Sequence, residues 1–435
     1  MAGSPDQVSR LGIVALPTTT VRQLGSSQAL VDPSFVVKEL IDNALDARAS
    51  SIFVDISADT INTIVVKDTG HGIQEEDQPL IARRYCTSKI RDFHDVRDIG
   101  GNWLGFRGTA LANIAEMSGT LEITTRVEGE PVARTLRFGG DGELILPIQV
   151  ASAAAGTTVK VTGLFDHLPV RKLAAPKMAT KWLAKIKRTI KAYALARPTV
   201  QFRFHVLKAD NRNDFVYAPK AGADVEDSAL KVIGRGAFQY DWIALETNGF
   251  DIRILLPISG CDMLRLSNDG PFLCVDCRPV SCERGILKQI TTKVKDRLEE
   301  VNVNFNARKN IFFLMDIKCP KGSYDPNIEP AKDDVLFQDP YAVLEAVDEL
   351  MKSYHSQSTF DLQAYIDTSS SAIQIAQADL MEAKTTMNMT GDIRHGSLQS
   401  IEEMPPSRFE HSKSLWRSNM YGVDEDDLEM LAEIQ

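Results

Sequence analysis

The chain has 435 residues and carries 49 Lys and Arg against 59 Asp and Glu, a formal net charge of -10 that argues against a simple nucleic-acid-coating protein. The acidity lies at one end, because the last 75 residues hold 14 acidic and 5 basic side chains, whereas the first 360 hold 45 and 44. With 43% hydrophobic residues the chain can build two folded domains. No apolar run approaches the roughly 18 residues that span a bilayer, and the start lacks the apolar core of a signal peptide, so we expect a soluble intracellular protein with no membrane partner.

The first predicted element is a helix over residues 33–48. Asp32 is a candidate N-cap, the next residue is a proline, and apolar residues recur at helical spacing behind them. Glu39, Asn43 and Asp46 lie at i, i+4 and i+7, so their polar groups converge on one face of the helix. Such a face is most often simply solvated, so the helix alone does not establish a site.

Strands are predicted at 51–57 and 63–68, and the second ends in the sequence DTGHGI. Asp68 at the end of this strand can accept a hydrogen bond from an exocyclic amine. Gly70 and Gly72 allow a planar ligand to approach the backbone. Taken alone, the motif is equally compatible with an ordinary turn.

A helical stretch is predicted near 77–90, followed by a glycine-rich loop and a short helix at 109–118. The loop sequence LGFRGTAL, residues 104–111, opens into the short helix, so that free backbone N–H groups and the helix dipole can bind an anion. Its plainer interpretation is a glycine-rich helix start. The three motifs in this order favour a binding site over unrelated turns.

The remaining periodicities predict an α+β fold, with helices on one side of a mixed or antiparallel sheet. Strand-like runs follow at 120–127, 131–138, 143–150 and 157–162, and then a basic helix at about 176–195. A second unit has strands near 200–207, 214–217, 250–257, 271–276 and 311–317, and helices near 284–302 and 339–355. The expected domains are residues 1–205, residues 206–358 and an acidic, mostly disordered tail at 359–435.

Three cysteines close in sequence, Cys274, Cys277 and Cys282, allow a zinc interpretation. However, Cys274 and Cys277 lie in a strand-like run, where residues three apart point to opposite faces, and no second ligand pair follows. Buried free thiols are therefore the preferred interpretation.

The strings VVKELIDNALDA, DTGHGI, YCTSKI, LGFRGTAL and GTTVKVTGLF resemble the MutL family of DNA mismatch repair proteins, which belongs to the GHKL group of ATPases. The similarity runs from about residue 15 to 350, and TSKI and GFRG distinguish this family from the topoisomerase, chaperone and histidine kinase branches. LPTTTVRQLGSSQ and PVRKL are most similar to the eukaryotic postmeiotic-segregation branch. The resemblance implies a GHKL-type ATPase sandwich followed by a transducer domain of the ribosomal-protein-like α/β fold.

The resemblance also implies roles for individual residues in binding ATP and Mg²⁺. Glu39 would be the general base that activates the attacking water, and Asn43 would hold the Mg²⁺ through its carbonyl oxygen. Asp68 would accept from the adenine amino group, supported by Thr157 or Thr158. The other implied nucleotide contacts are Gly70, Gly72, Thr87, Ser88, Lys89, Gly105, Phe106, Arg107, Gly108, Thr109, Ala110 and Leu111. Lys332, in the motif PNIEPAKDDVLF, would reach the γ-phosphate from the second domain.

Two features depart from the family pattern and leave two functions open. Thr109 stands where the family usually has Glu, and Gly100, Gly101 and Trp103 precede the GFRG motif, so we expect altered lid behaviour. The first alternative is a slow ATPase whose nucleotide state controls N-terminal dimerisation and DNA engagement. The second is a non-catalytic accessory subunit that binds nucleotide and partner with little turnover. The family's C-terminal dimerisation domain and endonuclease motif are not found in these 435 residues, so we expect no nuclease activity from this chain.

Macromolecular partners follow from the basic helix and from the resemblance. Lys181, Lys185 and Arg188 are the expected contacts to single- or double-stranded DNA, independent of sequence. The resemblance implies another MutL-family subunit as heterodimer partner, mismatch-recognition proteins of the MutS family, and a nuclear location.

Overall fold

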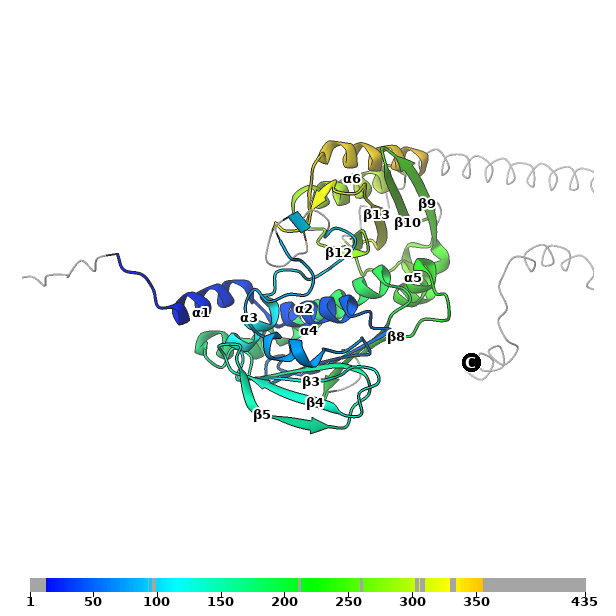
Figure 1. The fold of residues 1–435 in the computed structure, drawn as a ribbon. Coiled ribbons are helices and arrows are strands. Elements are labelled where there is room, and N and C mark those ends of the chain that lie inside the picture. Colours follow the sequence, from blue (N-terminus) through cyan, green and yellow to red (C-terminus); the bar gives the residue numbers. More distant parts are fainter. Residues whose placement is uncertain are drawn as a thin grey trace, which may run out of the picture. The chain divides into compact units, whose positions relative to one another are not determined.

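A computed structural model describes residues 13–354 except 93, 96–98, 210–212, 259–260, 302–304, 306–309 and 329–333 (Figure 1). Lys332 and the tail expected at 359–435 lie outside the described residues. Within the described ranges, no helix combines the length and the apolar character that a bilayer crossing requires.

An eight-stranded sheet forms the first half of the described chain, in the order β5-β4-β3-β6-β2-β1-β7-β8. Its strands are β1 (Ser51–Ser57), β2 (Thr63–Asp68), β3 (Thr120–Arg126), β4 (Ala133–Phe138), β5 (Leu144–Ala151), β6 (Gly156–Thr162), β7 (Gln201–Leu207) and β8 (Phe215–Tyr217). Neighbours are antiparallel except β1 and β7, which are parallel. Because β8 pairs with β7, the sheet continues past residue 205, where the first domain was expected to end.

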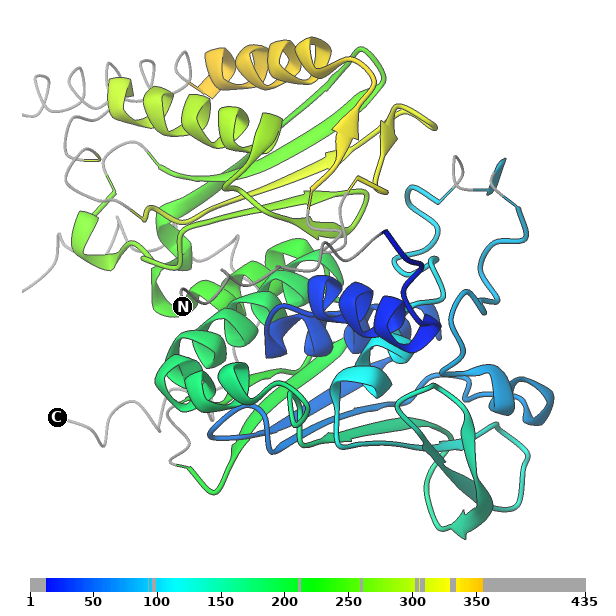
Figure 2. The same ribbon diagram turned by 90° about the vertical axis from the view of Figure 1, so that its left-hand side faces the viewer.

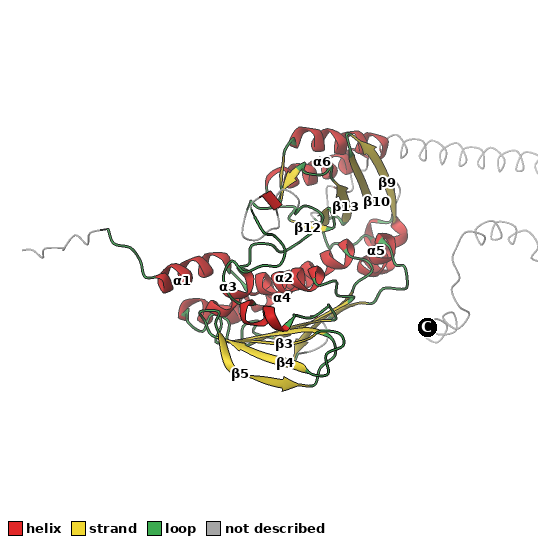
Figure 3. Ribbon diagram, in the orientation of Figure 1, coloured by secondary structure: helices red, strands yellow, loops and turns green. Residues whose placement is uncertain are grey.

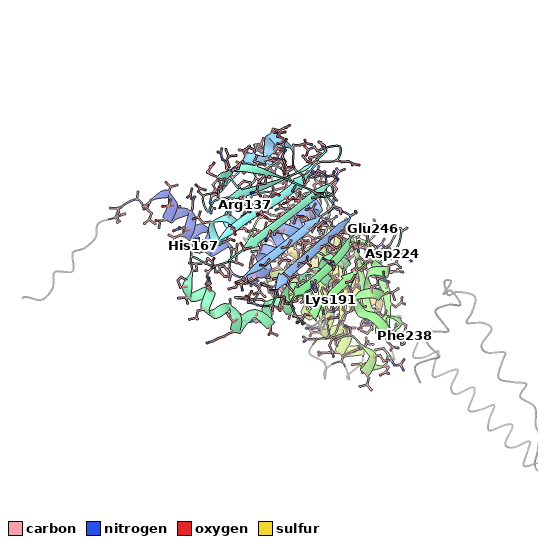
Figure 4. The ribbon with its side chains drawn as sticks, turned by 90° about the horizontal axis from the view of Figure 1, so that it is seen from below. Arg137, His167, Lys191, Asp224, Phe238 and Glu246 are labelled. Atoms are coloured by element: carbon pink, nitrogen blue, oxygen red, sulfur yellow. The ribbon has the colours of Figure 1, made fainter. Side chains whose placement is uncertain are left out.

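One face of this sheet is covered by helices (Figures 1 and 3). They are α1 (Thr18–Ala29), α2 (Pro33–Asp46), α3 (Ala110–Met117) and α4 (Pro169–Ala196). Figure 4 views the opposite face, where Arg137 of β4 projects and pairs with Glu122 of β3 at 2.9 Å. The arrangement confirms the expected α+β class, with the apolar sides of strands and helices meeting in one buried core.

In this region one helix was not predicted and two predictions differ from the structure. Helix α1 was not predicted. Helix α4 begins at Pro169 rather than near 176, because burial of Ala175 and Ala179 stabilises a helix that runs through Pro176. The helix predicted near 77–90 is wrong: only a 3₁₀ segment, η1 (Glu75–Leu80), forms there, and it contains a proline. Beyond it Tyr85 has a φ of 62°, which no α-helix accommodates.

A second, five-stranded sheet has the order β12-β11-β13-β10-β9, with β11 and β13 parallel. Its strands are β9 (Tyr240–Thr247), β10 (Phe250–Pro257), β11 (Pro271–Val275), β12 (Arg278–Val280) and β13 (Phe313–Lys318). Helix α6 (Gly285–Val301) and the helical residues 340–354 lie side by side over one face (Figures 1 and 2). The sheet and these helices enclose a second hydrophobic core.

Shorter elements complete the described chain. Helix α5 (Val225–Ile233) begins with a capping box between Asp224 and Asp227, and a two-stranded ladder joins β14 (Tyr324–Asp325) to β15 (Leu336–Phe337). The six cysteines are free thiols, and burial raises the pKa of Cys274.

Candidate functional site

A cavity of about 800 Å³ is lined by α2, the ends of β2 and β6, the loop between β2 and α3, and α3 itself. Of the residues predicted to bind nucleotide, those that line it are Glu39, Asn43, Asp68, Gly72, Thr87, Ser88, Lys89, Gly105, Phe106, Arg107, Gly108, Thr109, Ala110, Leu111 and Thr157. Gly70 and Thr158 are not part of the lining, and Lys332 lies outside the described residues. Motifs separated by more than a hundred residues therefore meet around one space.

Asp68 lies at the buried end of the cavity, with 7% of its surface exposed. Its Oδ1 accepts hydrogen bonds from the backbone N–H groups of Gly70, at 2.7 Å, and Thr157, at 3.2 Å. Burial raises the pKa of Asp68 to about 6, and these two hydrogen bonds oppose the rise. Because neighbouring residues of β6 face opposite ways, Thr157 lines the cavity and Thr158 does not.

The polar face of α2 borders the cavity as the helical spacing predicts. The helix starts where predicted, because Asp32 caps it by accepting from the backbone N–H of Ser34 at 2.8 Å. The opposite face buries apolar side chains in the core. Glu39, Asn43 and Asp46 all line the cavity from one side. A carboxylate suited to general-base chemistry and a carboxamide oxygen suited to Mg²⁺ are thereby held on one rigid element.

The phosphate loop, defined as Leu104–Leu111, is fixed by a residue to which the sequence assigned no role. Asp46 accepts from the backbone N–H groups of Leu104 and Gly105, both at 2.9 Å. Lys89 Nζ bonds to Asp46 Oδ2 at 2.5 Å and to Asn43 Oδ1 at 3.1 Å. The only sequence signal for Asp46 was its place seven residues after Glu39 on the polar face of α2.

Glycine is required at two positions of the cavity lining, Gly72 and Gly108. Gly108 has a φ of 62°, and a Cβ there would lie 2.6 Å from the carbonyl oxygen of Cys86. Gly72 has a φ of 75°, and a Cβ there would lie 2.4 Å from the carbonyl oxygen of Arg126.

The side chain of Thr109, at the N-cap of α3, makes no capping hydrogen bond, so the amides of the first turn are left for another acceptor. This donor set fits the phosphates of a nucleotide, and the hard oxygen of Asn43 fits Mg²⁺.

Two hydrogen-bonded contacts connect the phosphate loop to residues of the second sheet and its loops. Arg107 Nε donates to Asn327 Oδ1 at 2.8 Å, and Asn327 belongs to the motif that carries Lys332. Arg278, on β12, donates to the carbonyl oxygens of Trp103 and Leu104. Arg278 was not predicted to be a site residue, since no motif in the sequence contains it.

The three residues predicted to contact DNA differ in what they bind within the protein. Lys185 pairs with Asp32 at 2.9 Å. Arg188 donates to the carbonyl oxygens of Asp269 and Pro271, and its guanidinium lies 4.3 Å from the centre of the Phe272 ring. Lys181 is exposed on α4. The structure therefore gives Lys185 and Arg188 intramolecular partners and leaves Lys181 facing solvent.

Two stretches of the chain match known protein families. Residues 31–162 match the family described as histidine kinase-, DNA gyrase B-, and HSP90-like ATPase, and residues 230–355 match the C-terminal domain of DNA mismatch repair proteins. The DNA mismatch repair protein PMS1 of Arabidopsis thaliana is 29% identical over 82% of this chain and 37% of its own length. PMS1 protein homolog 1 of Homo sapiens is 30% identical over 85% and 39%, and MutL of Thermotoga maritima is 29% identical over 84% and 67%.

The chain spans about two-fifths of the length of the two eukaryotic relatives. Among solved structures, the crystal structure of the N-terminal domain of a DNA repair protein superimposes with a TM-score of 0.62. It is 23% identical and covers 79% of this chain and 99% of its own. The two proteins therefore share a fold over most of the described residues.

Proposed function

Because the chain belongs to the MutL family of DNA mismatch repair proteins and carries a GHKL-type ATPase domain, we propose that it binds ATP in the cavity and hydrolyses it slowly. The observation that carries the proposal is the convergence of Glu39, Asn43 and Asp68 with the phosphate loop around one space of about 800 Å³. A base, a metal ligand and a row of amides are the parts that phosphoryl transfer to water uses, and an adenine acceptor selects the nucleotide.

Each part has a place in this reaction. Asp68 accepts from the adenine amino group beside Thr157, and the phosphate loop receives the phosphates. Glu39 orients a water molecule and takes its proton. Asn43 would hold Mg²⁺, which when bound neutralises charge on the phosphates. Lys332 is proposed to approach the γ-phosphate from the second domain.

We further propose that nucleotide binding controls dimerisation through the N-terminal helix. Ser26 of α1 is buried and donates to Asn113 of α3 at 3.1 Å, and Asn113 also lines the cavity. The same helix exposes Val21 and Leu24. A change in the cavity can thus alter an apolar surface suited to another MutL-family subunit. Engagement of DNA independent of sequence, cooperation with MutS-family proteins and a nuclear location complete this proposal.

The proposal is tested by Glu39→Gln, which removes the base and keeps the size of the side chain. We expect ATP affinity within about threefold of the unmodified protein and a fall in turnover of about 10²-fold or more. Binding is measured by equilibrium dialysis and turnover by phosphate release. Glu76→Gln, a change of an exposed residue in η1, is the matched control. Unchanged turnover in Glu39→Gln would exclude Glu39 as the base.

A non-catalytic accessory subunit remains the second candidate, and Thr109 is the observation that favours it. The threonine replaces an acidic residue usual in the family and does not cap α3. Stoichiometric ATP binding by the purified chain, with phosphate release no faster than in Glu39→Gln, would identify the accessory function.

A further inference from the structure

Arg278 is a buried arginine of β12, with 3% of its surface exposed. Its Nη2 donates to the carbonyl oxygen of Trp103 at 2.9 Å, and both Nη atoms donate to that of Leu104 at 3.3 Å. Between described residues, Arg278 forms no ion pair with a carboxylate. A buried guanidinium without such a partner is costly, so these two carbonyl groups supply much of its compensation.

The same two peptide groups are bonded on their other side by Asp46. In the peptide that joins Trp103 to Leu104, the carbonyl oxygen accepts from Arg278 and the N–H donates to Asp46 Oδ1. In the peptide that joins Leu104 to Gly105, the carbonyl oxygen also accepts from Arg278, and the N–H donates to Asp46 Oδ2. In a trans peptide the N–H and C=O groups point in opposite directions, so fixing the oxygens determines where the N–H groups point.

We propose that Arg278 is a positioning residue for the nucleotide site: from the second domain it orients the first two amides of the phosphate loop toward Asp46, which lines the cavity. The inference rests on the proposed ATP-binding function. A guanidinium suits this task because its planar fork reaches two oxygens at once, whereas a lysine supplies a single point of contact.

Arg278 follows a turn that is hydrogen-bonded to β13 and to Cys319, so its position depends on the position of the second sheet. It follows the turn at Asp276 and Cys277, both with positive φ, between β11 and β12. The backbone N–H of Asp276 donates to the carbonyl oxygen of Ile317, and Asp276 Oδ1 accepts from the backbone N–H of Cys319, each at 3.0 Å. The guanidinium is thereby tied to the end of β13, and a displacement of that strand is transmitted to the phosphate loop.

The test uses the full chain with Arg278→Met and Arg278→Lys, the lysine variant being the milder change if methionine prevents folding. Arg253→Met, on β10 of the same sheet, is the matched control, since Arg253 is exposed and does not contact the loop. The first measurement is hydrogen exchange of the peptide containing Leu104 and Gly105, without nucleotide. We expect exchange about tenfold faster or more in both Arg278 variants, because three charge-assisted hydrogen bonds to two carbonyl groups are lost or weakened.

The second measurement compares how much each variant changes KM for ATP with how much it changes kcat. A residue that orients the binding amides should raise KM more than it lowers kcat, and Arg278→Lys should recover part of the loss. Unchanged exchange in the loop would overturn the proposal, and so would equal loosening of β10 and the loop, which indicates general destabilisation. Because the exchange measurement needs no nucleotide, it decides the role of Arg278 even if the chain proves not to bind ATP.

Discussion

Asp68 gives the nucleotide site a pH response of its own. Burial raises its pKa to about 6, and only the deprotonated carboxylate offers both oxygens as acceptors to an amino group and the backbone. We therefore expect ATP affinity to fall about tenfold between pH 7 and pH 5, as the carboxylate is protonated. Titration of the ATP phosphates contributes equally to any variant. Asp68→Asn removes the titrating group, so the ratio of the two affinities isolates its effect.

The stability of the protein should respond to Asp68 in the opposite direction. A carboxyl group whose pKa is raised by folding stabilises the folded state below its unfolded pKa, near 3.8, and this contribution is lost as pH rises through about 6. Asp68→Asn should therefore raise Tm at pH 7 and have little effect near pH 4, as measured by calorimetry without nucleotide. If the difference in Tm between the unmodified protein and Asp68→Asn did not depend on pH, folding would leave the pKa of Asp68 unchanged.

Single residues of the site could be predicted where their own motif carries the signal. Glu39, Asn43 and Asp68 stand in short strings whose spacing places them together on a helix face or at a strand end. Asp46 and Arg278 could not be predicted, because their partners in the phosphate loop lie 58 and 174 residues away. The choice between Thr157 and Thr158 depended on the register of β6 against β2, which no local pattern gives.

At the scale of elements, α4 divides its basic residues between internal contacts and solvent. All four of these residues, Lys177, Lys181, Lys185 and Arg188, are exposed, but Lys185 and Arg188 also bond to Asp32 and to backbone carbonyls. If α4 contacts DNA, Lys177 and Lys181 should carry the phosphate contacts. We expect Lys177→Glu with Lys181→Glu to weaken binding to duplexes of any sequence and to lower the salt slope by roughly one to two units.

The control for this prediction is Lys67→Glu with Lys160→Glu, an equal charge change on exposed residues of β2 and β6. Binding is measured by fluorescence anisotropy at several salt concentrations. Equal loss in both double variants would show a general effect of net charge. Arg188→Glu should instead lower Tm, since it removes the guanidinium donors to the carbonyl groups of Asp269 and Pro271.

The elements that could be predicted are those whose periodicity is strong. Strands β1, β2 and β6 alternate buried residues with partly buried or exposed ones, and α2 has a cap and a clear apolar face. Helix α1 has no such face, because its buried residue is Ser26, and polar pairs join Ser26 and Arg22 to α3. Its helicity depends on packing that the sequence pattern does not encode.

At the scale of the whole molecule, Arg107 and Arg278 connect the phosphate loop to residues of the second sheet and its loops by hydrogen bonds. If DNA binds to the protein and ATP to the cavity, the two ligands should influence each other, and the influence must be reciprocal. We expect a non-hydrolysable ATP analogue to raise DNA affinity about fivefold or more, and DNA to raise affinity for the analogue by the same factor. Titrations in both orders check this equality. Affinities that do not change would show that the sites are energetically independent.

The bonds of Asp46 to Leu104 and Gly105 have a consequence for how any anion enters the cavity. These two donors already have a carboxylate acceptor, and that carboxylate is neutralised by Lys89. An incoming phosphate that takes the same N–H groups substitutes one oxyanion for another, so its net gain is the difference between two similar interactions. Such an exchange keeps the loop folded at every stage and favours rapid, reversible release over very tight retention.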